Sequence, residues 1–204
     1  MQLVPTQEDV VGLLKQTEAL RHGHFEYPSG MHSDTYLQVA LAMRYHQHAK
    51  TLGVGLSRLV RANPEIRALI PRLSIVAPAT GGLPVAYGVC EALRAHQVYW
   101  AEPDEATHNL RFRQYLEQVP GEKVLLVDDF IRTGRRLTQM KNLVEANGAE
   151  VVGFAVIIYQ PTPKTPDFSP LPFYYLAKLD GKYYPDASSC ELCKQGIPVD
   201  KVWM

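Results

Sequence analysis

The middle of the chain alternates short apolar runs with helix-like segments, and this alternation constrains the fold more than any other feature. Four runs are apolar enough for buried strands: residues 73–77, 97–101, 123–127 and 150–158. Helical segments are expected at residues 50–62, 82–95 and 136–147. Apolar strands that alternate with helices through short turns are typical of a parallel sheet covered on both faces. The sequence therefore predicts a Rossmann-like α/β fold with a mostly parallel sheet of about five strands.

The two ends of the chain fall outside this alternation. The N-terminal part predicts an amphipathic helix over residues 7–22, with Thr6 as its N-cap, and a strand over residues 35–43. Prolines recur throughout residues 161–172, which predicts an irregular segment followed by a short tail. We therefore expect a single domain over residues 1–204, with its core at residues 50–160 and a small cap built from residues 1–45 and 161–204.

Charge and composition narrow the class of protein. Of the 204 residues, 46% are hydrophobic and 21% charged, which excludes extended disorder. A chain of this size buries roughly 70% of its unfolded surface, so its core requires neither a disulfide nor a metal. Lys and Arg together number 21, as do Asp and Glu, so the basic excess of a general nucleic-acid binder is missing.

Membrane and export signals are also missing from the sequence. The longest apolar run covers residues 151–159, whereas a membrane span needs about 20 residues. The N-terminus lacks the basic and apolar regions of a signal peptide. Three cysteines, an odd number, favour a reducing compartment. We expect a cytoplasmic protein with small-molecule substrates and without nucleic-acid or membrane partners.

The segment from residue 124 to 137 carries the strongest chemical signal. A predicted strand leads into Asp128 and Asp129, a turn with Thr133 and Gly134 follows, and a helix then begins. Ligands of open α/β sheets bind at the carboxyl ends of the strands, and the amides at the start of the next helix attract phosphate. Two carboxylates would repel phosphate but suit sugar hydroxyls or a bound metal ion. The segment predicts a sugar-phosphate site, the alternative being that the aspartates only solubilise a strand end and cap the helix.

This segment resembles the 5-phosphoribosyl-1-pyrophosphate motif of type I phosphoribosyltransferases. Other motifs resemble the orotate phosphoribosyltransferase-like branch of that family. Gly23-His24-Phe25 and residues 29–37 resemble its Phe…Ser-Gly-x-His-Ser-x-x-Tyr segment, and residues 77–83 resemble its pyrophosphate loop. Residues 190–198 resemble the Cys-x-x-Cys-x-x-Gly-x-Pro ending of one prokaryotic subgroup.

The resemblance implies a reaction, a cofactor and an assembly. Family members transfer ribose 5-phosphate from 5-phosphoribosyl-1-pyrophosphate to a base nitrogen, here orotate or a related base of pyrimidine nucleotide biosynthesis, with Mg²⁺, and a homodimer is expected. Negative charge develops on the departing pyrophosphate, so the metal ion and backbone donors supply the main electrostatic aid. The resemblance assigns the pyrophosphate to Thr80, Gly81 and Gly82, the ribose hydroxyls to Asp128 and Asp129, directly or through Mg²⁺, the 5-phosphate to Arg132, Thr133, Gly134, Arg135 and Arg136, and the base to Phe25, Ser29, Gly30 and Tyr36.

The phosphate loop and the base pocket depart from the family pattern. Arg132, Arg135 and Arg136 replace small residues, so these arginines either clamp a phosphate or crowd the loop and point into solvent. The residue usual at position 132 is a threonine that touches the base. The sequence Tyr159-Gln160 stands where the nearest subgroup has Asp-Arg, and that arginine is expected to meet the carboxylate of orotate.

The mobile catalytic loop differs as well. Pro103 stands where a basic residue is expected, and Arg111 and Arg113 either replace the missing cations as catalytic residues or lie in a solvated loop. These departures motivate a second hypothesis, a non-catalytic sugar-phosphate-binding or regulatory member of the same fold.

Cysteines and histidines leave a third hypothesis, a redox or zinc protein. Cys190 and Cys193 form a Cys-x-x-Cys pair, but structural zinc takes four ligands and the sequence has no second pair. The two thiols either stay reduced in a turn or join a site shared across a dimer. His22 and His24, like His46 and His48, are spaced i, i+2, which on a helix does not place both on one face. Metal binding by either histidine pair is not expected, and for His32 we expect a hydrogen-bonded structural role or a ligand contact.

Overall fold

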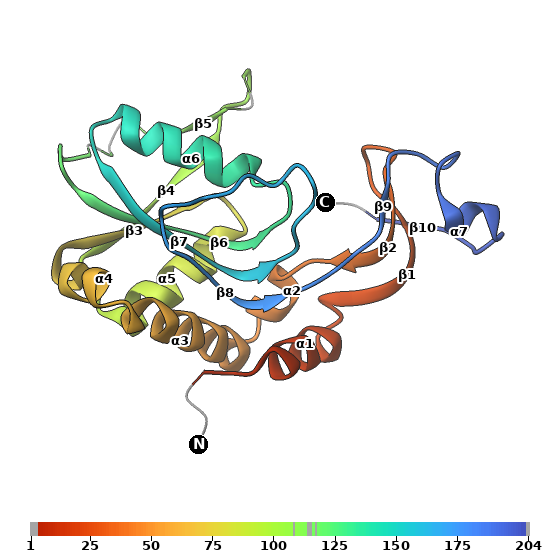
Figure 1. Cartoon of the computed structure of the whole chain (residues 1–204), viewed down its shortest axis with the longest axis horizontal. Coiled ribbons are helices and arrows are strands. Elements are labelled where there is room, and N and C mark those ends of the chain that lie inside the picture. The colour runs from red at the N-terminus through yellow and green to blue at the C-terminus, as the bar shows by residue number, and fades with distance from the viewer. Residues whose placement is uncertain (1–3, 108, 114–115, 117, 203–204) are drawn as a thin grey trace.

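A computed structural model describes residues 4–107, 109–113, 116 and 118–202, and it contains two sheets (Figure 1). The larger sheet has six strands in the order β5-β4-β3-β6-β7-β8. Neighbouring strands run parallel except β4 and β5, which are antiparallel. The predicted mostly parallel α/β sheet is therefore confirmed. Its strands are β3 (Leu73–Pro78), β4 (Gln97–Pro103), β5 (Leu110–Arg111), β6 (Lys123–Ile131), β7 (Glu150–Tyr159) and β8 (Phe173–Lys178).

Helices cover both faces of this sheet, as the apolar strands require (Figure 1). Successive side chains of a strand point to opposite faces. Leu125 of β6 accordingly packs in one apolar cluster, and Leu126 packs in the other. The first cluster includes residues of α1 (Gln7–Gln16), α3 (His46–Ala62), α4 (Pro64–Leu69) and α5 (Gly82–Leu93), and the second includes residues of α6 (Arg135–Ala146).

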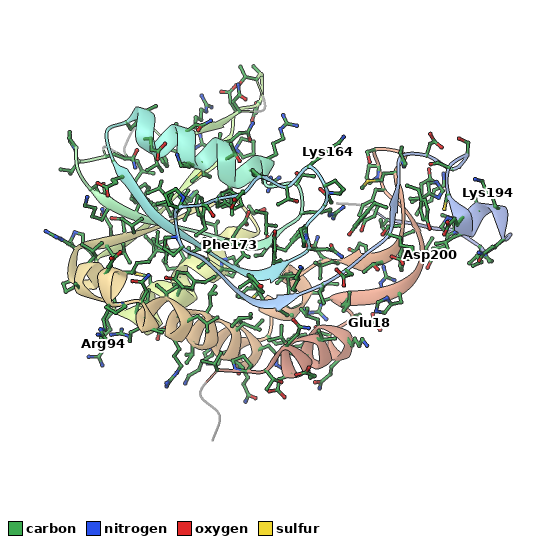
Figure 2. All side chains as sticks on the ribbon, in the orientation of Figure 1. Glu18, Arg94, Lys164, Phe173, Lys194 and Asp200 are labelled. Atoms are coloured by element: carbon green, nitrogen blue, oxygen red, sulfur yellow. The ribbon has the colours of Figure 1, made fainter. Side chains whose placement is uncertain are left out.

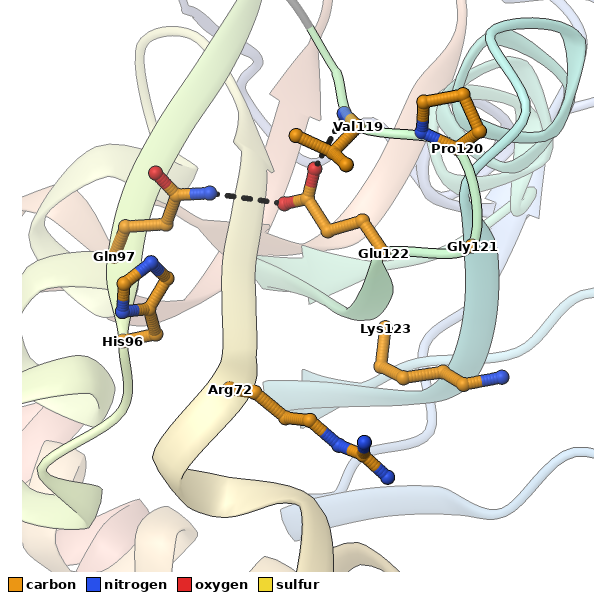
Figure 3. Close-up of a pocket in the computed structure, with 8 residues that line it drawn as sticks. All are labelled: Arg72, His96, Gln97, Val119, Pro120, Gly121, Glu122 and Lys123. Atoms are coloured by element: carbon orange, nitrogen blue, oxygen red, sulfur yellow. Dashed lines mark hydrogen bonds between the residues drawn. The ribbon is translucent and has the colours of Figure 1, made fainter.

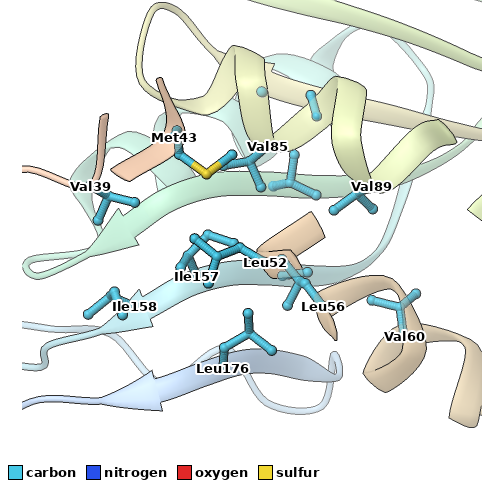
Figure 4. Close-up of a cluster of buried hydrophobic side chains, with 14 of the residues drawn as sticks. Val39, Met43, Leu52, Leu56, Val60, Val85, Val89, Ile157, Ile158 and Leu176 are labelled. Atoms are coloured by element: carbon cyan, nitrogen blue, oxygen red, sulfur yellow. The ribbon is translucent and has the colours of Figure 1, made fainter. Parts of the chain in front are cut away.

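The contact between α3 and α5 forms the centre of the first cluster (Figure 4). Leu52 and Leu56 of α3 and Val85 and Val89 of α5 have no exposed surface. A Cβ at Gly53 would lie 3.1 Å from the backbone of Gly88, so small residues let these two helices approach closely.

The smaller sheet joins the two ends of the chain. Its strand order is β10-β1-β2-β9. The hairpin β1–β2 comes from the N-terminal part, and β9 and β10 come from the C-terminal tail, so strands from both ends of the chain pair in one sheet (Figure 1). The remaining elements are β1 (Leu20–Glu26), β2 (His32–Leu37), β9 (Tyr183–Tyr184), β10 (Asp200–Lys201), α2 (Ala40–Met43), α7 (Glu191–Lys194) and a 3-10 turn, η1 (Ile70–Arg72).

Two N-terminal boundaries differ from the sequence prediction. The helix expected over residues 7–22 ends at Gln16 with Thr17 as its C-cap, because Glu18 takes a positive φ of 57°, which lies outside the right-handed helical region. The strand expected over residues 35–43 occupies His32–Leu37 instead, and the apolar residues after it form α2.

Residues 173–178 also lie elsewhere than expected. The sequence predicts them to be part of the cap, yet they form β8 and pair in parallel with β7. The physical reason is packing: Leu176 and Ala177 are buried in the main core together with α3. The proline-rich segment before β8 therefore serves as the crossover that returns the chain to the sheet.

Candidate active site at the carboxyl edge of the large sheet

A cleft of about 500 Å³ opens where β3 and β6 end. It brings together the loop after β3, the acidic pair of β6 and the loop that starts α6. The loop after β3 precedes the other two segments by about 50 residues, and the carboxyl edge of a parallel sheet is where such segments meet. The cleft is lined by Gln38, Ala40, Thr80, Gly81, Asp128, Asp129, Phe130, Ile131, Arg132, Thr133, Gly134, Arg135, Arg136 and Leu137.

The acidic pair lies inside strand β6 rather than after it. Phe130 and Ile131 continue the pairing with β7, which extends the strand beyond the predicted end. Asp128 and Asp129 are only 4% and 6% exposed. The amide of Asp129 donates to Asp128 Oδ1 (2.9 Å), and the amide of Phe130 donates to Asp129 Oδ1 (2.8 Å). Backbone hydrogen bonds thus fix the orientation of both carboxyl groups.

Burial dominates the electrostatics of this pair. It raises the pKa of Asp128 well above its ordinary value, and the charge of Asp129 raises it further. Burial also raises the pKa of Asp129, whereas hydrogen bonds and the Arg136 guanidinium act in the opposite direction. Two partly desolvated carboxylates favour a cation or hydroxyl donors beside them. The pair therefore has the chemistry of a polyol or metal site.

The loop after β3 packs directly on the acidic pair. A Cβ at Gly81 would lie 2.7 Å from Asp129 Oδ2, and one at Gly82 would lie 3.1 Å from Asp128 Oδ1. The residues predicted to hold pyrophosphate thus approach the residues predicted to hold ribose, and only glycine permits this approach. The peptide bond between Ala79 and Thr80 in this loop is cis.

The loop before α6 is supported from behind by the proline-rich segment. Gly134 is the N-cap of α6 and has a φ of 73°, and a Cβ there would lie 2.5 Å from Pro166 Cδ. The hydroxyl of Thr165 donates to the carbonyl of Arg132. The first amides of a helix have no partner within the helix and attract anions. The loop therefore presents the start of α6 to the cleft.

The three arginines of this loop adopt two different arrangements. The Arg132 guanidinium lies 4.6 Å from the ring centroid of Tyr183 and 5.3 Å from that of Tyr27. Arg135 and Arg136 are exposed in the first turn of α6. Arg132 is thus held against aromatic rings of the smaller sheet, while the other two face solvent at the mouth of the cleft.

Arg111 and Arg113 do not belong to the described lining of the cleft. They lie on the β4–β5 hairpin, where Arg111 pairs with Asp104 (3.0 Å) and Arg113 Nε donates to Glu102 (2.6 Å). Hydrogen bonds to Arg113 lower the pKa of Glu102. In this conformation both cations are bound to acids of their own hairpin.

The four residues assigned to the base pocket also lie outside the described lining. Phe25 and Tyr36 pack in the apolar cluster of the smaller sheet, and the Arg21 guanidinium lies 4.6 Å from the ring centroid of Tyr36. Ser29 and Gly30 are exposed in the β1–β2 turn.

Sequence reasoning missed several residues near the cleft. Gln38 and Ala40 line the cleft just after β2, although the sequence predicts them to be part of a strand. Gln160 stands where the family resemblance predicts an arginine, and in the structure it is fully buried and accepts a hydrogen bond from Tyr183 (2.7 Å). Only a chain trace could reveal these positions, because no local pattern marks them.

A second hollow of about 280 Å³ lies at the opposite edge of the sheet (Figure 3). It is built around the first residues of β4 and β6, Gln97 and Lys123, and Gln97 donates to Glu122 across it (3.0 Å). Parallel sheets bind ligands at the other edge, so the cleft at Asp128 and Asp129 is the candidate active site.

Comparison with known proteins agrees with this site. The phosphoribosyl transferase domain family matches residues 65–170, a range that spans the loop after β3, the acidic pair and the start of α6. The chain belongs to the phosphoribosyltransferase family. Along nearly its full length it is similar to orotate phosphoribosyltransferases. It is 34% identical over 194 residues to the enzyme of Carboxydothermus hydrogenoformans, covering 95% of both chains, and 35% identical over 189 residues to that of Thermotoga maritima, covering 93% of this chain and 94% of the other.

Solved structures show the same fold. The crystal structure of orotate phosphoribosyltransferase from Aeropyrum pernix matches with a TM-score of 0.66 at 20% identity, over 83% of this chain and 93% of that one. A phosphoribosyltransferase from Corynebacterium diphtheriae matches with a TM-score of 0.61 at 25% identity, over 84% and 95% of the two chains. Within the described residues, no helix has the length and apolar character of a membrane-crossing segment.

Proposed function

We propose that this chain transfers ribose 5-phosphate from 5-phosphoribosyl-1-pyrophosphate to orotate, a step of pyrimidine nucleotide biosynthesis. One observation carries the proposal: a single cleft gathers the glycine loop after β3, a buried pair of aspartates and the start of α6. These three features match the three parts of the donor, its pyrophosphate, its ribose and its 5-phosphate. Relatives named orotate phosphoribosyltransferase over nearly the whole chain support the same reaction.

Each group of the cleft has a distinct task in this mechanism. Amides at the start of α6, with the Thr133 hydroxyl, bind the 5-phosphate. Asp128 and Asp129 accept hydrogen bonds from the ribose hydroxyls, and their negative charge favours the cationic ribose of the transition state. Thr80 and Gly81 bind the pyrophosphate, whose charge grows as it leaves. The cleft thus stabilises opposite charges on the two sides of the breaking bond.

The donor set of the cleft also fits Mg²⁺. This ion prefers carboxylate, phosphate and water oxygens, and two carboxyl groups held by backbone amides meet that preference. Asp128 and Asp129 are the residues that would hold it, together with oxygens of the donor. When bound, Mg²⁺ neutralises part of the charge on the departing pyrophosphate.

Two unpaired donors support an acidic base as the acceptor. Arg132 Nε and Gln160 Nε2 are buried and have no hydrogen-bond partner among the described residues. Both side chains meet Tyr183: its ring lies against Arg132, and its hydroxyl donates to Gln160. Unpaired buried donors are costly, and a ligand that accepts from them removes the cost. Position 160 lacks the arginine that the family uses to bind the carboxylate of orotate. We propose that Arg132 supplies this cation instead.

Pyrophosphate release tests the reaction. Purified protein is given 5-phosphoribosyl-1-pyrophosphate, Mg²⁺ and a panel of bases, and we expect release with orotate and much less with bases that lack the carboxylate. Absence of release with every base rejects the enzyme. Calorimetric binding of the donor without turnover would instead favour the non-catalytic binder. The pairing of Arg111 with Asp104 and of Arg113 with Glu102 is the observation that supports this alternative.

The assembly and the compartment are part of the same proposal. We infer a homodimer, which the resemblance to the family implies, and a cytoplasmic location, which the odd number of cysteines favours. Sedimentation of the purified chain tests the dimer directly.

A further inference from the structure

Four side chains that the catalytic proposal does not use gather at the far end of the smaller sheet. They are His24 of β1, His32 of β2, and Cys190 and Cys193 around the start of α7. One nitrogen or sulfur atom from each lies within 4.8 Å of all the others. His24 and His32 are 3% and 4% exposed, and Cys190 has no exposed surface. The sequence separations of 166 and 169 residues between His24 and the two cysteines explain why local patterns did not reveal the group.

The distances within this group are close to those of a tetrahedral zinc site. Cys190 Sγ and Cys193 Sγ each lie 3.5 Å from His24 Nε2, and Cys193 Sγ lies 3.5 Å from His32 Nδ1. Zinc bonds of about 2.3 Å to sulfur and about 2.0 Å to nitrogen place tetrahedral ligand atoms about 3.3–3.8 Å apart. The two histidine nitrogens are closer, at 2.8 Å, so they would separate by about half an ångström to reach that geometry.

The hydrogen bonding of His24 prepares it to be a ligand. Its Nδ1 lies 2.7 Å from the carbonyl oxygen of Ile197. A carbonyl only accepts, so Nδ1 carries the proton and Nε2 presents its lone pair toward the two sulfurs. Metal-bound histidines use the same arrangement, in which a carbonyl orients the ring from its other nitrogen.

The tail that carries the cysteines has little apolar packing of its own. Helix α7 has four residues and none is buried, and residues 194–201 are exposed. Lys194 and Asp200 lie at the end of the molecule that the smaller sheet forms, away from Phe173 of the large sheet (Figure 2). Backbone pairing of β9 with β2 and of β10 with β1 holds the tail on either side of the cluster. A crosslink at the cluster would therefore fix a segment that the core does not reach.

We propose that His24, His32, Cys190 and Cys193 bind one structural Zn²⁺ ion within a single chain. Two thiolates and two neutral imidazoles form a closed tetrahedral set that leaves no position for substrate, which is the pattern of structural rather than catalytic zinc. The ion ties the β1–β2 hairpin to the C-terminal tail. This site is independent of the proposed reaction, because none of its four residues lines the cleft.

Elemental analysis of the full-length chain, purified without chelators from zinc-supplemented cells, tests the proposal. We expect about one zinc per chain in the wild type, and a loss of at least about tenfold in His24→Gln and in Cys193→Ser. Two matched controls keep their zinc: His22→Gln, an exposed histidine on the same strand, and Cys90→Ser, the third cysteine, in α5. A wild type that stays well below one zinc after reconstitution overturns the proposal, as does unchanged zinc in both ligand variants.

A second measurement covers variants that fail to fold. The wild-type chain is loaded with Co²⁺ in place of zinc and its absorption spectrum is recorded. We expect the intense visible bands of tetrahedral cobalt together with thiolate charge-transfer bands, and a spectrum of weak octahedral bands would contradict the site.

Thiol reactivity and intact mass distinguish the zinc site from two alternatives, a Cys190–Cys193 disulfide and a hydrogen-bonded cluster without metal. A chelator should expose two additional thiols to a thiol reagent and should speed proteolysis of the tail between residues 185 and 200. An intact mass two hydrogens lower would show a Cys190–Cys193 disulfide and overturn the proposal. Thiol reactivity that does not change with chelator would show a hydrogen-bonded polar cluster without metal, with the same consequence.

Discussion

The two sheets of this chain are stabilised in different ways. The large sheet has apolar clusters on both faces, with side chains of α3 and α5 on one and of α6 on the other. Within the described part of the chain, the apolar cluster of the smaller sheet has four buried members, Phe25, Tyr27, Tyr36 and Val202. Beside it lies the polar group of two histidines and two cysteines. Apolar packing on both faces therefore stabilises the large sheet, whereas the smaller sheet depends on the pairing of strands from the two ends of the chain.

The largest effect on stability should come from the core of the large sheet. Leu56 on α3 has no exposed surface, so Leu56→Ala should lower the free energy of unfolding by about 2–5 kcal/mol. The exposed Val119→Ala should change it by less than about 0.5 kcal/mol. Denaturant unfolding measures both. A larger loss on chelation than in Leu56→Ala would show that the smaller sheet, not the large one, dominates the stability of the chain.

Catalysis should depend on the acidic edge of the large sheet. Asp129→Asn keeps the shape of the side chain but removes its charge beside Gly81, so turnover should fall by at least about 10²-fold. Steady-state pyrophosphate release measures this. The control Glu145→Gln, on the exposed face of α6, should keep its turnover. Unchanged turnover in Asp129→Asn would remove this carboxylate from the mechanism.

Arg132 lines the cleft of the large sheet and contacts Tyr183 of the smaller sheet. Because its guanidinium stacks on Tyr183 and is proposed to bind the carboxylate of the base, Arg132→Met should raise the KM for orotate by at least about tenfold. The KM for 5-phosphoribosyl-1-pyrophosphate should change less. The reverse pattern would assign Arg132 to the 5-phosphate, which is the other role that the sequence left open.

The smallest effect that we expect is a change in the free energy of unfolding when Asp128 of the acidic pair loses its charge. Burial, and then the charge of Asp129, raise the pKa of Asp128, so the folded state binds its proton more tightly than the unfolded state does. Stability therefore falls as pH rises from about 3.9, the unfolded value, through the raised folded value. Asp128→Asn removes this cost and should be more stable than the wild type at pH 7, with the gain shrinking as pH falls.

Asp167 is an exposed aspartate whose contribution to stability should change with pH in the opposite direction, so it serves as a control. Hydrogen bonds from Ser169 lower the pKa of Asp167, so its contribution to stability is present above the unfolded pKa and is lost as pH falls through the folded one. Asp167→Asn should therefore lose stability at pH 7. Thermal unfolding across pH compares the two variants, and equal trends would contradict the assigned environments.

The large sheet was predictable because its signals are local. Apolar runs at residues 73–77, 123–127 and 150–158 each gave a strand, and the order of Asp128, Asp129 and the loop before α6 predicted a sugar-phosphate site where the structure has a cleft. Their meeting at one edge follows from the rules of parallel sheets. Strand β8 escaped prediction because its place depends on the crossover formed by the proline-rich segment.

The smaller sheet was less predictable because its contacts are distant in sequence. Strands β9 and β10 are two residues long, and their partners lie 150 to 175 positions earlier. The Cys-x-x-Cys pair was visible, but the search for a second pair along the chain missed His24 and His32. Their spacing of eight residues becomes a shared site only when a hairpin brings β1 and β2 together.

A crystal structure with 5-phosphoribosyl-1-pyrophosphate and Mg²⁺ bound tests the central claim most directly. We expect the 5-phosphate within hydrogen-bond distance of the amides at Thr133 and Gly134, and the ribose hydroxyls beside Asp128 and Asp129. A donor bound elsewhere, or a cleft closed by the side chains of Arg135 and Arg136, would contradict this account of the site.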